Sequence, residues 1–262
     1  MSRQNYYKTH RVRQKKHIEK ELILELAQAE RALQPKLGCR KVWELIKPEL
    51  EQSSISIGRD LFFAFMAEQD MLIKRSRQSV RTTDSRHRFT TYGNLLKEKE
   101  LTGVHQAWVS DITYLRTEEG FVYLSLVMDA FSRKIVGYDC SDSLEAEGCL
   151  RALSSAIKQL PAGSTAIHHS DRGCQYCCHA YVNTLKEAGL QISMTEENHC
   201  YENAQAERLN GILKQEYGLG ETFKKKAHAY RAVREAIELY NTRRPHQALG
   251  YQIPAQVHQA AA

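Results

Sequence analysis

Three apolar segments that follow one another in the middle of the chain constrain its fold most strongly. Residues 107–115, "AWVSDITYL", alternate between two faces, with Trp108 on one and Asp111 on the other. Residues 120–128, "GFVYLSLVM", are apolar on both faces, which is typical of a central strand, and residues 133–140, "RKIVGYDC", follow after a short break. These patterns predict strands, so we expect a meander of three β-strands.

Helices and strands alternate after this meander. Residues 144–160 have helical periodicity, with Asp142 as the expected N-cap, Glu145 three residues on and Pro161 closing the helix. Residues 164–171 predict a fourth strand, a helix follows to Gly189, and residues 190–194 predict a fifth strand. This order predicts an α/β fold with a mixed five-stranded sheet and helices on both of its faces.

Residues 1–74 predict a separate, all-α region. The expected helices span residues 17–33, 40–46 and 55–72, with Pro35 and Pro48 ending the first two. The polar turn before the third helix resembles a helix-turn-helix, whose recognition helix would be opened by Ser56, Gly58, Arg59 and Asp60. A three-helix bundle with no role in nucleic-acid binding is the alternative. Residues 75–100 lose periodicity and are expected to form a basic linker.

Positive charge is concentrated in two blocks. The chain has 262 residues, with 37 Lys or Arg against 31 Asp or Glu and a net charge of +6. Residues 1–20 hold seven basic residues and one acid, Glu19, and residues 74–88 hold six basic residues and one acid, Asp84. Such blocks are usually solvated, but two of them in one chain favour a polyanionic partner, most simply nucleic acid.

Composition excludes several other classes. No apolar run approaches the roughly 18 residues of a membrane span, and the N-terminus lacks the apolar core of a signal peptide, so we expect a cytoplasmic protein. Seven scattered cysteines indicate reduced thiols rather than a disulfide framework. Cys174, Cys177, Cys178 and His179 superficially suggest zinc, but no second ligand pair with finger-like spacing accompanies them.

Three acids have positions that suggest a common site. Asp111 lies within a largely apolar strand, where an unpaired carboxylate is costly. Asp171 ends the fourth strand, where open α/β sheets place ligands, and Glu207 lies on the helix after the fifth strand. Each acid alone is more often structural, but together they form a plausible site for two hard cations, which prefer oxygen ligands.

The helix expected over residues 200–217 carries an unusual polar face. Lys214 comes seven residues after Glu207, so both lie on one face, with Asn203 and Asn210 just beside them. The apolar stripe on the opposite side consists of Ala206, Leu209, Ile212 and Leu213. An ordinary amphipathic helix with a solvated polar face is the alternative.

Five segments, in order, resemble a known family: "WVSDITYL", "DAFSRKIVGY", "HSDRGCQY", "NAQAERLNGILKQE" and "YNTRRPHQALGY". They are similar to the integrase-type catalytic core of bacterial insertion-sequence transposases of the OrfB kind, whose fold is shared with retroviral integrases and ribonuclease H. The resemblance covers about residues 99–255. We therefore expect a catalytic core with a C-terminal helix at residues 101–255 and a tail at 256–262. Asp171 and Glu207 enclose 35 residues (172–206), a spacing similar to the family's signature.

The resemblance implies a function and roles for particular residues. Asp111, Asp171 and Glu207 would be the catalytic metal ligands for two Mg²⁺ ions, with Mn²⁺ as a substitute, in DNA nicking followed by strand transfer. Lys214 falls where the family has a basic residue. Further candidates for contacts with DNA are Arg59, Arg172, Arg243 and Arg244. For each of the last three, a merely solvated charge is the more common alternative.

The resemblance also implies partners. These are double-stranded DNA at the element ends and at the target, further copies of the chain assembled on DNA, and an upstream DNA-binding protein made as a frameshift fusion. A location on the bacterial nucleoid would follow from DNA binding. Many relatives have a basic residue and a glycine after Ser-Met-Ser, whereas this chain reads "SMTEENHC", with Glu196 and Glu197 near the expected DNA path.

Two alternatives remain on the sequence alone. One is a DNA-binding protein whose core has lost activity, although the three acids and Lys214 are all present. The other is a ribonuclease H-like nuclease that hydrolyses DNA without joining it. The basic N-terminal region is the main feature that argues against this alternative.

Overall fold

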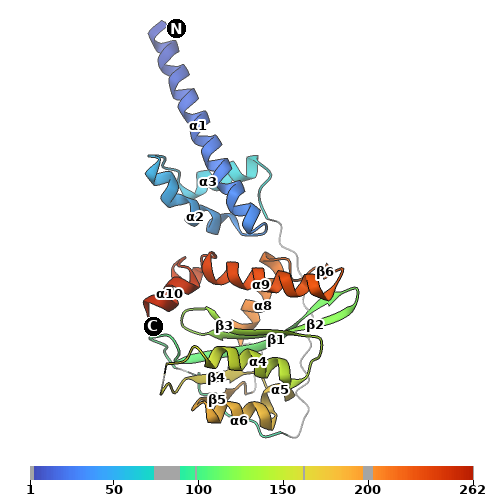
Figure 1. The fold of residues 1–262 in the computed structure, drawn as a ribbon. Helices are drawn as coiled ribbons and strands as arrows, with labels where there is room; N and C mark the ends of the chain where they lie inside the picture. Colours follow the sequence, from blue (N-terminus) through green and yellow to red (C-terminus); the bar gives the residue numbers. More distant parts are fainter. Residues whose placement is uncertain (1–2, 74–88, 98, 162, 197–202, 262) are drawn as a thin grey trace. The chain divides into compact units, whose positions relative to one another are not determined.

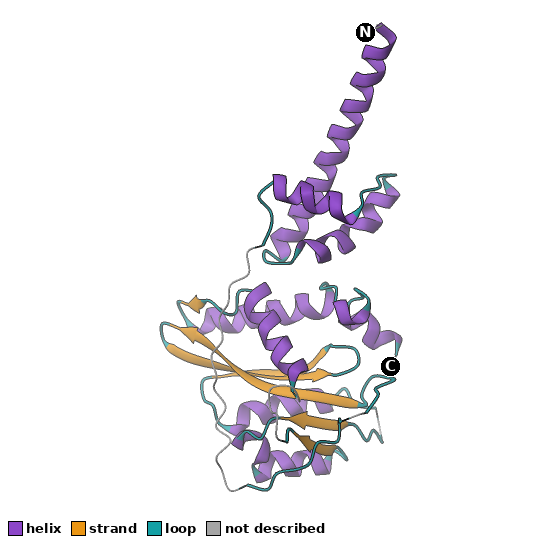
Figure 2. Ribbon diagram, turned by 180° about the vertical axis from the view of Figure 1, so that it is seen from behind, coloured by secondary structure: helices purple, strands orange, loops and turns teal. Residues whose placement is uncertain are grey.

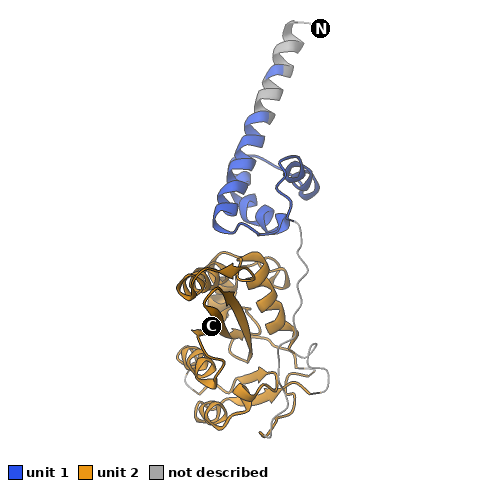
Figure 3. Cartoon of the chain, turned by 90° about the vertical axis from the view of Figure 1, so that its right-hand side faces the viewer, with its two compact units in different colours: residues 1–75 blue, residues 76–262 orange. Residues whose placement is uncertain are grey.

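The computed structural model describes residues 3–73, 89–97, 99–161, 163–196 and 203–261. The chain forms two compact units, residues 1–75 and 76–262, which are considered separately (Figure 3). The basic block expected at residues 74–88 lies outside the described residues, as does Glu197. Among the helices that the structure describes, none is long and apolar enough to cross a membrane.

The first unit consists of three helices, α1 (Arg3–Leu33), α2 (Cys39–Gln52) and α3 (Arg59–Glu68). Their shared apolar core includes Ile23, Ala27, Leu37, Val42, Ile46, Leu50, Phe62, Phe65 and Met66. Three helices were expected, but α1 begins at Arg3 rather than near residue 17.

The expectation that Pro48 ends the second helix was wrong. The helix α2 continues through Pro48 to Gln52. A proline inside a helix costs about 3 kcal/mol, because it removes one backbone hydrogen bond and crowds the preceding turn. Leu50, beyond the proline, is buried in the core of the unit, and its burial offsets part of that cost.

The second unit is built on one mixed sheet (Figure 1). Its strands are β1 (Ala107–Thr117), β2 (Gly120–Asp129), β3 (Ile135–Ser141), β4 (Ile167–Ser170), β5 (Gln191–Met194) and β6 (Thr222–Phe223). The order is β3-β2-β1-β4-β5, with β1, β2 and β3 antiparallel and β4 and β5 parallel to β1. This confirms the predicted meander and mixed sheet, to which the short strand β6 adds a pairing with the end of β1.

Helices cover both faces of the sheet (Figures 1 and 2). One face carries α8 (Ala204–Glu216) and α9 (Lys226–Thr242), and the other carries α4 (Ala146–Ile157), α5 (Cys174–Cys177) and α6 (His179–Glu187). The alternation along β1 has the predicted effect, because Val109 joins the apolar core under α8 and α9, whereas Trp108 joins the core under α4 and α6.

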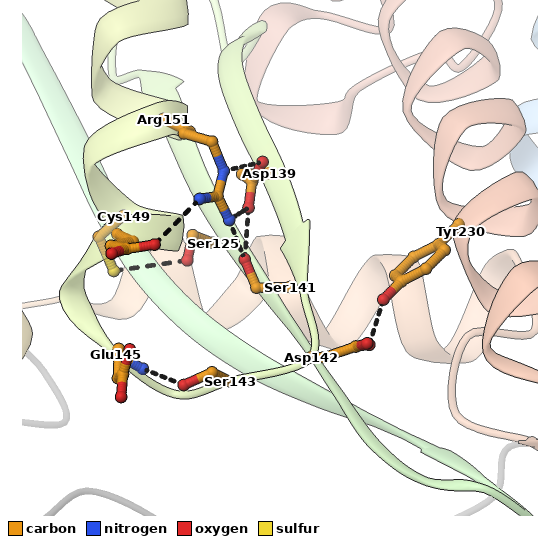
Figure 4. A network of polar contacts seen from close by, with 10 residues as sticks. Ser125, Asp139, Ser141, Asp142, Ser143, Glu145, Cys149, Arg151 and Tyr230 are labelled. Atoms are coloured by element: carbon orange, nitrogen blue, oxygen red, sulfur yellow. Dashed lines mark hydrogen bonds and ion pairs between the residues drawn. The ribbon is translucent and has the colours of Figure 1, made fainter.

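The start of α4 differs from the sequence-based expectation. The helix begins at Ala146, and Asp142 is not its N-cap. The Asp142 carboxylate instead accepts a hydrogen bond from the Tyr230 hydroxyl of α9 (Figure 4). It also lies 3.3 Å from Lys226 Nζ on the same helix. Asp142 therefore ties the end of β3 to α9, while Arg151 of α4 binds the Asp139 carboxylate of β3 with two nitrogens, at 2.9 Å each.

Two segments outside the expected core belong to the second unit. In the expected linker, the backbone N–H of Leu95 donates to Ser193 Oγ on β5 at 2.8 Å, and that of Asn94 donates to Glu196 Oε1 at 3.0 Å. The expected tail was wrong, because residues from Pro254 to Ala260 form α10 after a short 3-10 helix, Gln247–Leu249. The helix α10 is anchored by His258, which is buried and lies 2.9 Å from Ser132 Oγ.

Candidate active site

The register of two parallel strands brings the first two acids to the same end of the sheet. The strands β1 and β4 pair through three residues each, and the last pair is Val109 with His169. Asp111 and Asp171 each lie two residues beyond that pair. Neighbouring parallel strands therefore deliver both carboxylates at the carboxyl end of β4, where α/β sheets bind ligands.

Asp111 is partly buried and held at both of its oxygens. Its Oδ1 accepts a hydrogen bond from the backbone N–H of Ile112 at 2.8 Å. Its Oδ2 accepts one from Asn210 Nδ2 of α8 at 2.7 Å. The orientation of this carboxylate is therefore fixed by its own strand and by the helix that carries Glu207.

Asp171 follows β4 directly and is held by the tight turn into α5. Its Oδ1 accepts a hydrogen bond from the backbone N–H of Gly173 at 2.9 Å. A Cβ atom on Gly173 would lie 3.0 Å from the same oxygen, closer than such atoms normally approach. Glycine at this position leaves room for the carboxylate beside the backbone.

Glu207 lies in the first turn of α8 and has an exposed side chain. The helix begins after residues 197–202, which lie outside the described part of the chain. Its N-cap residue, Asn203, donates from Nδ2 to the backbone carbonyl of Ser110 at 3.1 Å. Glu207 is thus attached, through its helix, to the residue that precedes Asp111.

The three acids influence one another electrostatically. Burial raises the pKa of Asp111 to about 7, and the negative charges of Asp171 and Glu207 act in the same direction. The partial desolvation of Glu207 and the charge of Asp171 also raise the pKa of Glu207, although its side chain is exposed. Like charges that perturb each other in this way are typical of functional sites.

The donor set fits a hard divalent cation by its chemistry. Three carboxylates supply oxygen ligands, which Mg²⁺ prefers. The strand register brings Asp111 and Asp171 to one end of the sheet, and the bond from Asn210 to Asp111 joins the helix of Glu207 to that end. Within the described residues, however, no three His, Cys, Asp or Glu side chains are already grouped closely enough to hold an ion between them. Cys174, Cys177 and Cys178 are free thiols.

Lys214 is not a freely solvated lysine. It lies in the last turn of α8, is half-buried, and has its Nζ 4.7 Å from the centre of the Tyr114 ring on β1. Burial lowers its pKa, and the negative charge of Asp111 opposes that shift. The alternative of an ordinary solvated polar face on this helix is therefore wrong for Lys214.

The four candidate arginines have different surroundings. Arg244 is 2 % exposed, and its Nε and Nη2 lie 2.8 and 3.0 Å from the two carboxylate oxygens of Glu216. Its assignment as a DNA contact was wrong, because this buried ion pair joins the end of α9 to the end of α8. Arg243 is exposed and Arg172 half-buried, while Arg59 of the first unit lies 2.7 Å from Asp60. For these three, DNA contact stays a prediction.

Sequence reasoning missed the direct contacts that hold the acids. Asn203 and Asn210 stood out only as neighbours of Glu207, although two amides beside a conspicuous acid on one helix face were a usable signal. A buried network behind Asp111 also went unnoticed, in which His168 Nε2 lies 2.8 Å from Ser110 Oγ and 2.9 Å from the Tyr181 hydroxyl.

Comparison with known proteins identifies the family. Two models described as "Integrase core domain" match residues 102–200 and 188–254. The chain is 33% identical over 270 residues to the uncharacterized 31 kDa protein of insertion element IS600 from Shigella sonnei, covering 100% of this chain and 98% of that protein. It is 34% identical to the transposase of insertion sequence IS629 from the same organism, covering 85% of this chain and 74% of that one. The chain belongs to the insertion-sequence transposases with an integrase core.

Further similarities agree with this membership. The transposase InsF of insertion sequence IS3A from Escherichia coli K12 is 35% identical over 195 residues, which are 74% of this chain and 68% of that protein. Among solved structures, the fold is similar to a simian T-cell lymphotropic virus intasome, with a TM-score of 0.52 and 15% identity over 78% of this transposase and 67% of that chain. The sheet of this transposase thus has the ribonuclease H-like fold of integrase catalytic cores.

Proposed function

We propose that this transposase nicks DNA at the ends of an insertion sequence and joins the freed 3′ ends to a target, using Asp111, Asp171 and Glu207 as its catalytic carboxylates. The observation that carries the proposal is the placement of these acids in a chain of this family. Two of them follow the last residue pair of β1 and β4, and the pKa of Asp111 responds to the charges of the other two. A polynucleotidyl transferase needs such a cluster of oxygen ligands.

The three carboxylates would hold divalent cations, two Mg²⁺ in the active complex, with Mn²⁺ as a substitute. When bound, such ions supply activation of a water or a DNA 3′-hydroxyl and stabilisation of the leaving oxygen. The chain itself contributes by holding the carboxylates in position. Ile112 and Asn210 fix the Asp111 carboxylate, and the turn at Gly173 fixes that of Asp171.

DNA would be bound by basic residues in both units. Lys214 supplies a positive charge on the same helix as Glu207 and is the best-supported phosphate contact in the core. Arg172 and Arg243 are further candidates in the core, and Arg59 is the candidate in the first unit. The partners are the two element ends, the target duplex and further copies of the chain. A fusion with an upstream DNA-binding protein would add to the DNA binding. Action on DNA in this way places the protein in the bacterial cytoplasm, at the nucleoid.

Replacement of each of the three acids by its neutral amide tests the proposal. Asp111→Asn, Asp171→Asn and Glu207→Gln should each abolish Mg²⁺-dependent nicking and joining of labelled element ends, because metal ligation depends on the carboxylate charge. Binding of the same DNA, measured by gel shift without metal, should stay near that of the parent.

Glu235→Gln serves as the matched control, since Glu235 is an exposed acid on α9. It should retain both reactions. Substantial cleavage by any of the three active-site variants would remove that acid from the assignment. Hydrolysis without joining by the parent would identify a nuclease instead, and DNA binding without either reaction would identify an inactive core.

A further inference from the structure

Two asparagines of α8 bind consecutive residues of β1. Asn203 Nδ2 donates to the backbone carbonyl of Ser110 at 3.1 Å, and Asn210 Nδ2 donates to Asp111 Oδ2 at 2.7 Å. They lie seven residues apart, close to two helical turns, so both point to the same side of the helix. Glu207 lies between them, and the two bonds therefore fix the helix on both sides of this acid.

Both asparagines are unfavourable choices for packing alone. Their side chains are buried, at 3 % and 8 % exposure for Asn203 and Asn210. Within the described residues, the Oδ1 atom of each is buried and has no hydrogen-bond partner. An unpaired buried acceptor destabilises a fold, and the other buried residues of this helix are all apolar: Ala206, Leu209, Ile212 and Leu213. The reason for an amide at these two positions therefore lies in the hydrogen bond that each Nδ2 donates.

The direction of the Asn210 bond supplies that reason. A carboxylate accepts hydrogen bonds and cannot donate them when ionised, so Asn210 must turn its Nδ2 rather than its Oδ1 toward Asp111. The backbone N–H of Ile112 engages the other oxygen of the same carboxylate. With one donor at each oxygen, rotation of the Asp111 carboxylate is restricted while further lone pairs stay available for a cation.

Asn203 acts at the other end of the same helical segment. It is the N-cap residue, directly after residues 197–202, which lie outside the described residues, and it bonds to backbone rather than to a side chain. Its bond fixes where the first turn of α8 begins relative to β1. Because Glu207 occupies that first turn, the position of its carboxylate depends on this attachment.

We propose that Asn203 and Asn210 are positioning residues, which hold α8 on β1 so that Glu207 and Asp111 are kept in the arrangement needed to bind a divalent cation. This inference rests on the proposed function of the three acids. Partners that orient metal-binding carboxylates typically change metal affinity or activity by about 10- to 100-fold when they are removed.

The experiment compares Asn203→Ala, Asn210→Ala and Asn210→Leu with the parent. The leucine variant has nearly the shape of asparagine and cannot donate a hydrogen bond, so it carries the test if the alanine variant unfolds. The matched control is Asn241→Ala. Asn241 also ties a helix to a strand with two hydrogen bonds, from its Nδ2 to the carbonyl of Ile135 at 3.0 Å and to its Oδ1 from the N–H of Ile135 at 2.9 Å, but it contacts none of the three acids.

Binding of Mn²⁺ to the DNA-free protein, measured by electron paramagnetic resonance, is the first readout and needs no turnover. The second is the Mg²⁺ concentration that gives half-maximal cleavage of a labelled element end, and thermal unfolding is measured alongside. Removal of either asparagine should weaken Mn²⁺ binding and raise the required Mg²⁺ by about 10- to 100-fold. Asn210→Leu should do so with an unfolding temperature near the parent's, and Asn241→Ala should leave both metal readouts unchanged even where it lowers that temperature.

Three outcomes would overturn the inference. In the first, the Asn203 and Asn210 variants bind Mn²⁺ and respond to Mg²⁺ like the parent. In the second, Asn241→Ala weakens metal binding as much as they do, so that their effect is one of general stability. In the third, the parent itself does not bind Mn²⁺, which contradicts the role of the acids as well. A parent that binds Mn²⁺ but does not process DNA counts against the proposed function alone, since the Mn²⁺ comparison still decides the role of the asparagines.

Discussion

Lys214 and Tyr114 form a pair that links α8, the helix of Glu207, to β1, the strand of Asp111. The Tyr114 ring, which supports Lys214 at 4.7 Å, is itself in an edge-to-face contact with Phe121 at 5.4 Å. A cation held over an aromatic face is restricted in position and remains able to contact an anion on its other side. This is a suitable arrangement for a lysine that contacts a DNA phosphate at a fixed distance from the acids.

Removal of Lys214 should therefore weaken binding of the element ends more than it affects stability. Lys214→Ala should lower the log–log salt dependence of end binding by about 0.9, the value for one phosphate contact. Stability should fall by only about 0.5–2 kcal/mol, because cation–π contacts range from the lower value at exposed sites to the higher one when they are desolvated, and Lys214 is half-buried. Gel shifts over a salt series and urea unfolding measure the two effects.

The role of the ring is tested by Tyr114→Leu, with Tyr114→Phe as the control that keeps an aromatic face. The leucine variant should share part of the end-binding defect, and the double variant Lys214→Ala/Tyr114→Leu should be no worse than Lys214→Ala alone. End binding and strand transfer equal to the parent in Lys214→Ala would show that this lysine has no role with DNA.

The candidate site could be predicted from the sequence only in part. The positions of Asp111, Asp171 and Glu207 follow from strand order and spacing, and the structure puts the first two at the end of the same parallel pair. Arg244 could not be predicted, because its role depends on Glu216, which reaches it only through the packing of α8 against α9. Contacts between side chains of different elements are set by packing, and sequence spacing does not contain them.

At the scale of elements, close contact between α4 and β3 depends on one glycine. A Cβ atom at Gly137 would lie 2.2 Å from the backbone carbonyl of Ala152 on α4. Gly137→Ala should therefore destabilise the second unit by about 1–3 kcal/mol, the usual cost of overpacking. The same change at Gly211, inside α8 with nothing within 4 Å of its Cβ position, should stabilise it by about 1 kcal/mol. Urea unfolding measures the change in the free energy of unfolding for both variants. Changes of the same sign would contradict this account of the contact between α4 and β3.

The attachment of α10 should depend on pH. His258 is buried, and its Nδ1 donates to Ser132 Oγ, whose own proton goes to Asp129 Oδ1 at 2.7 Å. Burial, with the positive charge of Lys134, lowers the pKa of His258 from its ordinary 6.5 to about 4, while Asp129 opposes the shift. The folded protein keeps His258 neutral, whereas the unfolded chain protonates it below about pH 6.5. Stability from this residue is therefore complete above that pH and is lost as the pH falls toward 4.

His258→Gln should remove part of this pH dependence. Between pH 7.5 and pH 4.5 the parent should lose roughly 2.5 kcal/mol more stability than the variant, because one pKa unit corresponds to about 1.4 kcal/mol. Urea unfolding at the two pH values measures the difference. His228→Gln, at an exposed position on α9, should keep the parent's dependence, and the same dependence in His258→Gln would exclude His258 as its source.

The order of elements was more predictable than their ends. Periodicity identified the three helices of the first unit and the five main strands, because it reflects which face each segment buries. The sequence did not predict the ends of helices where contacts with residues distant in the sequence determine them. Leu50 extends α2 beyond Pro48, Asp142 binds α9 instead of capping α4, and His258 anchors a helix where a tail was expected.

At the scale of the whole molecule, the two units should divide the work of binding and catalysis. The first unit contains α1, whose sequence holds most of the basic residues of the chain's start, and the second contains the three acids. The structure also indicates where the chain can be divided. A cut after residue 98 would remove the bonds from Asn94 and Leu95 to Glu196 and Ser193, whereas a cut after residue 75 keeps them.

A protein consisting of residues 76–262 should therefore fold cooperatively, keep the Mn²⁺ binding of the parent, and bind DNA much more weakly. Its log–log salt slope of DNA binding should be smaller by about 0.9 for every phosphate that the first unit neutralises, since fewer counterions are released. Residues 99–262 form the comparison, with a lower unfolding temperature because the hydrogen bonds beside β5 are missing. Fluorescence anisotropy with a labelled element end over a salt series gives the slopes. If residues 76–262 bind with the slope of the full chain, the basic residues of the first unit are solvated and DNA is bound by the second unit alone.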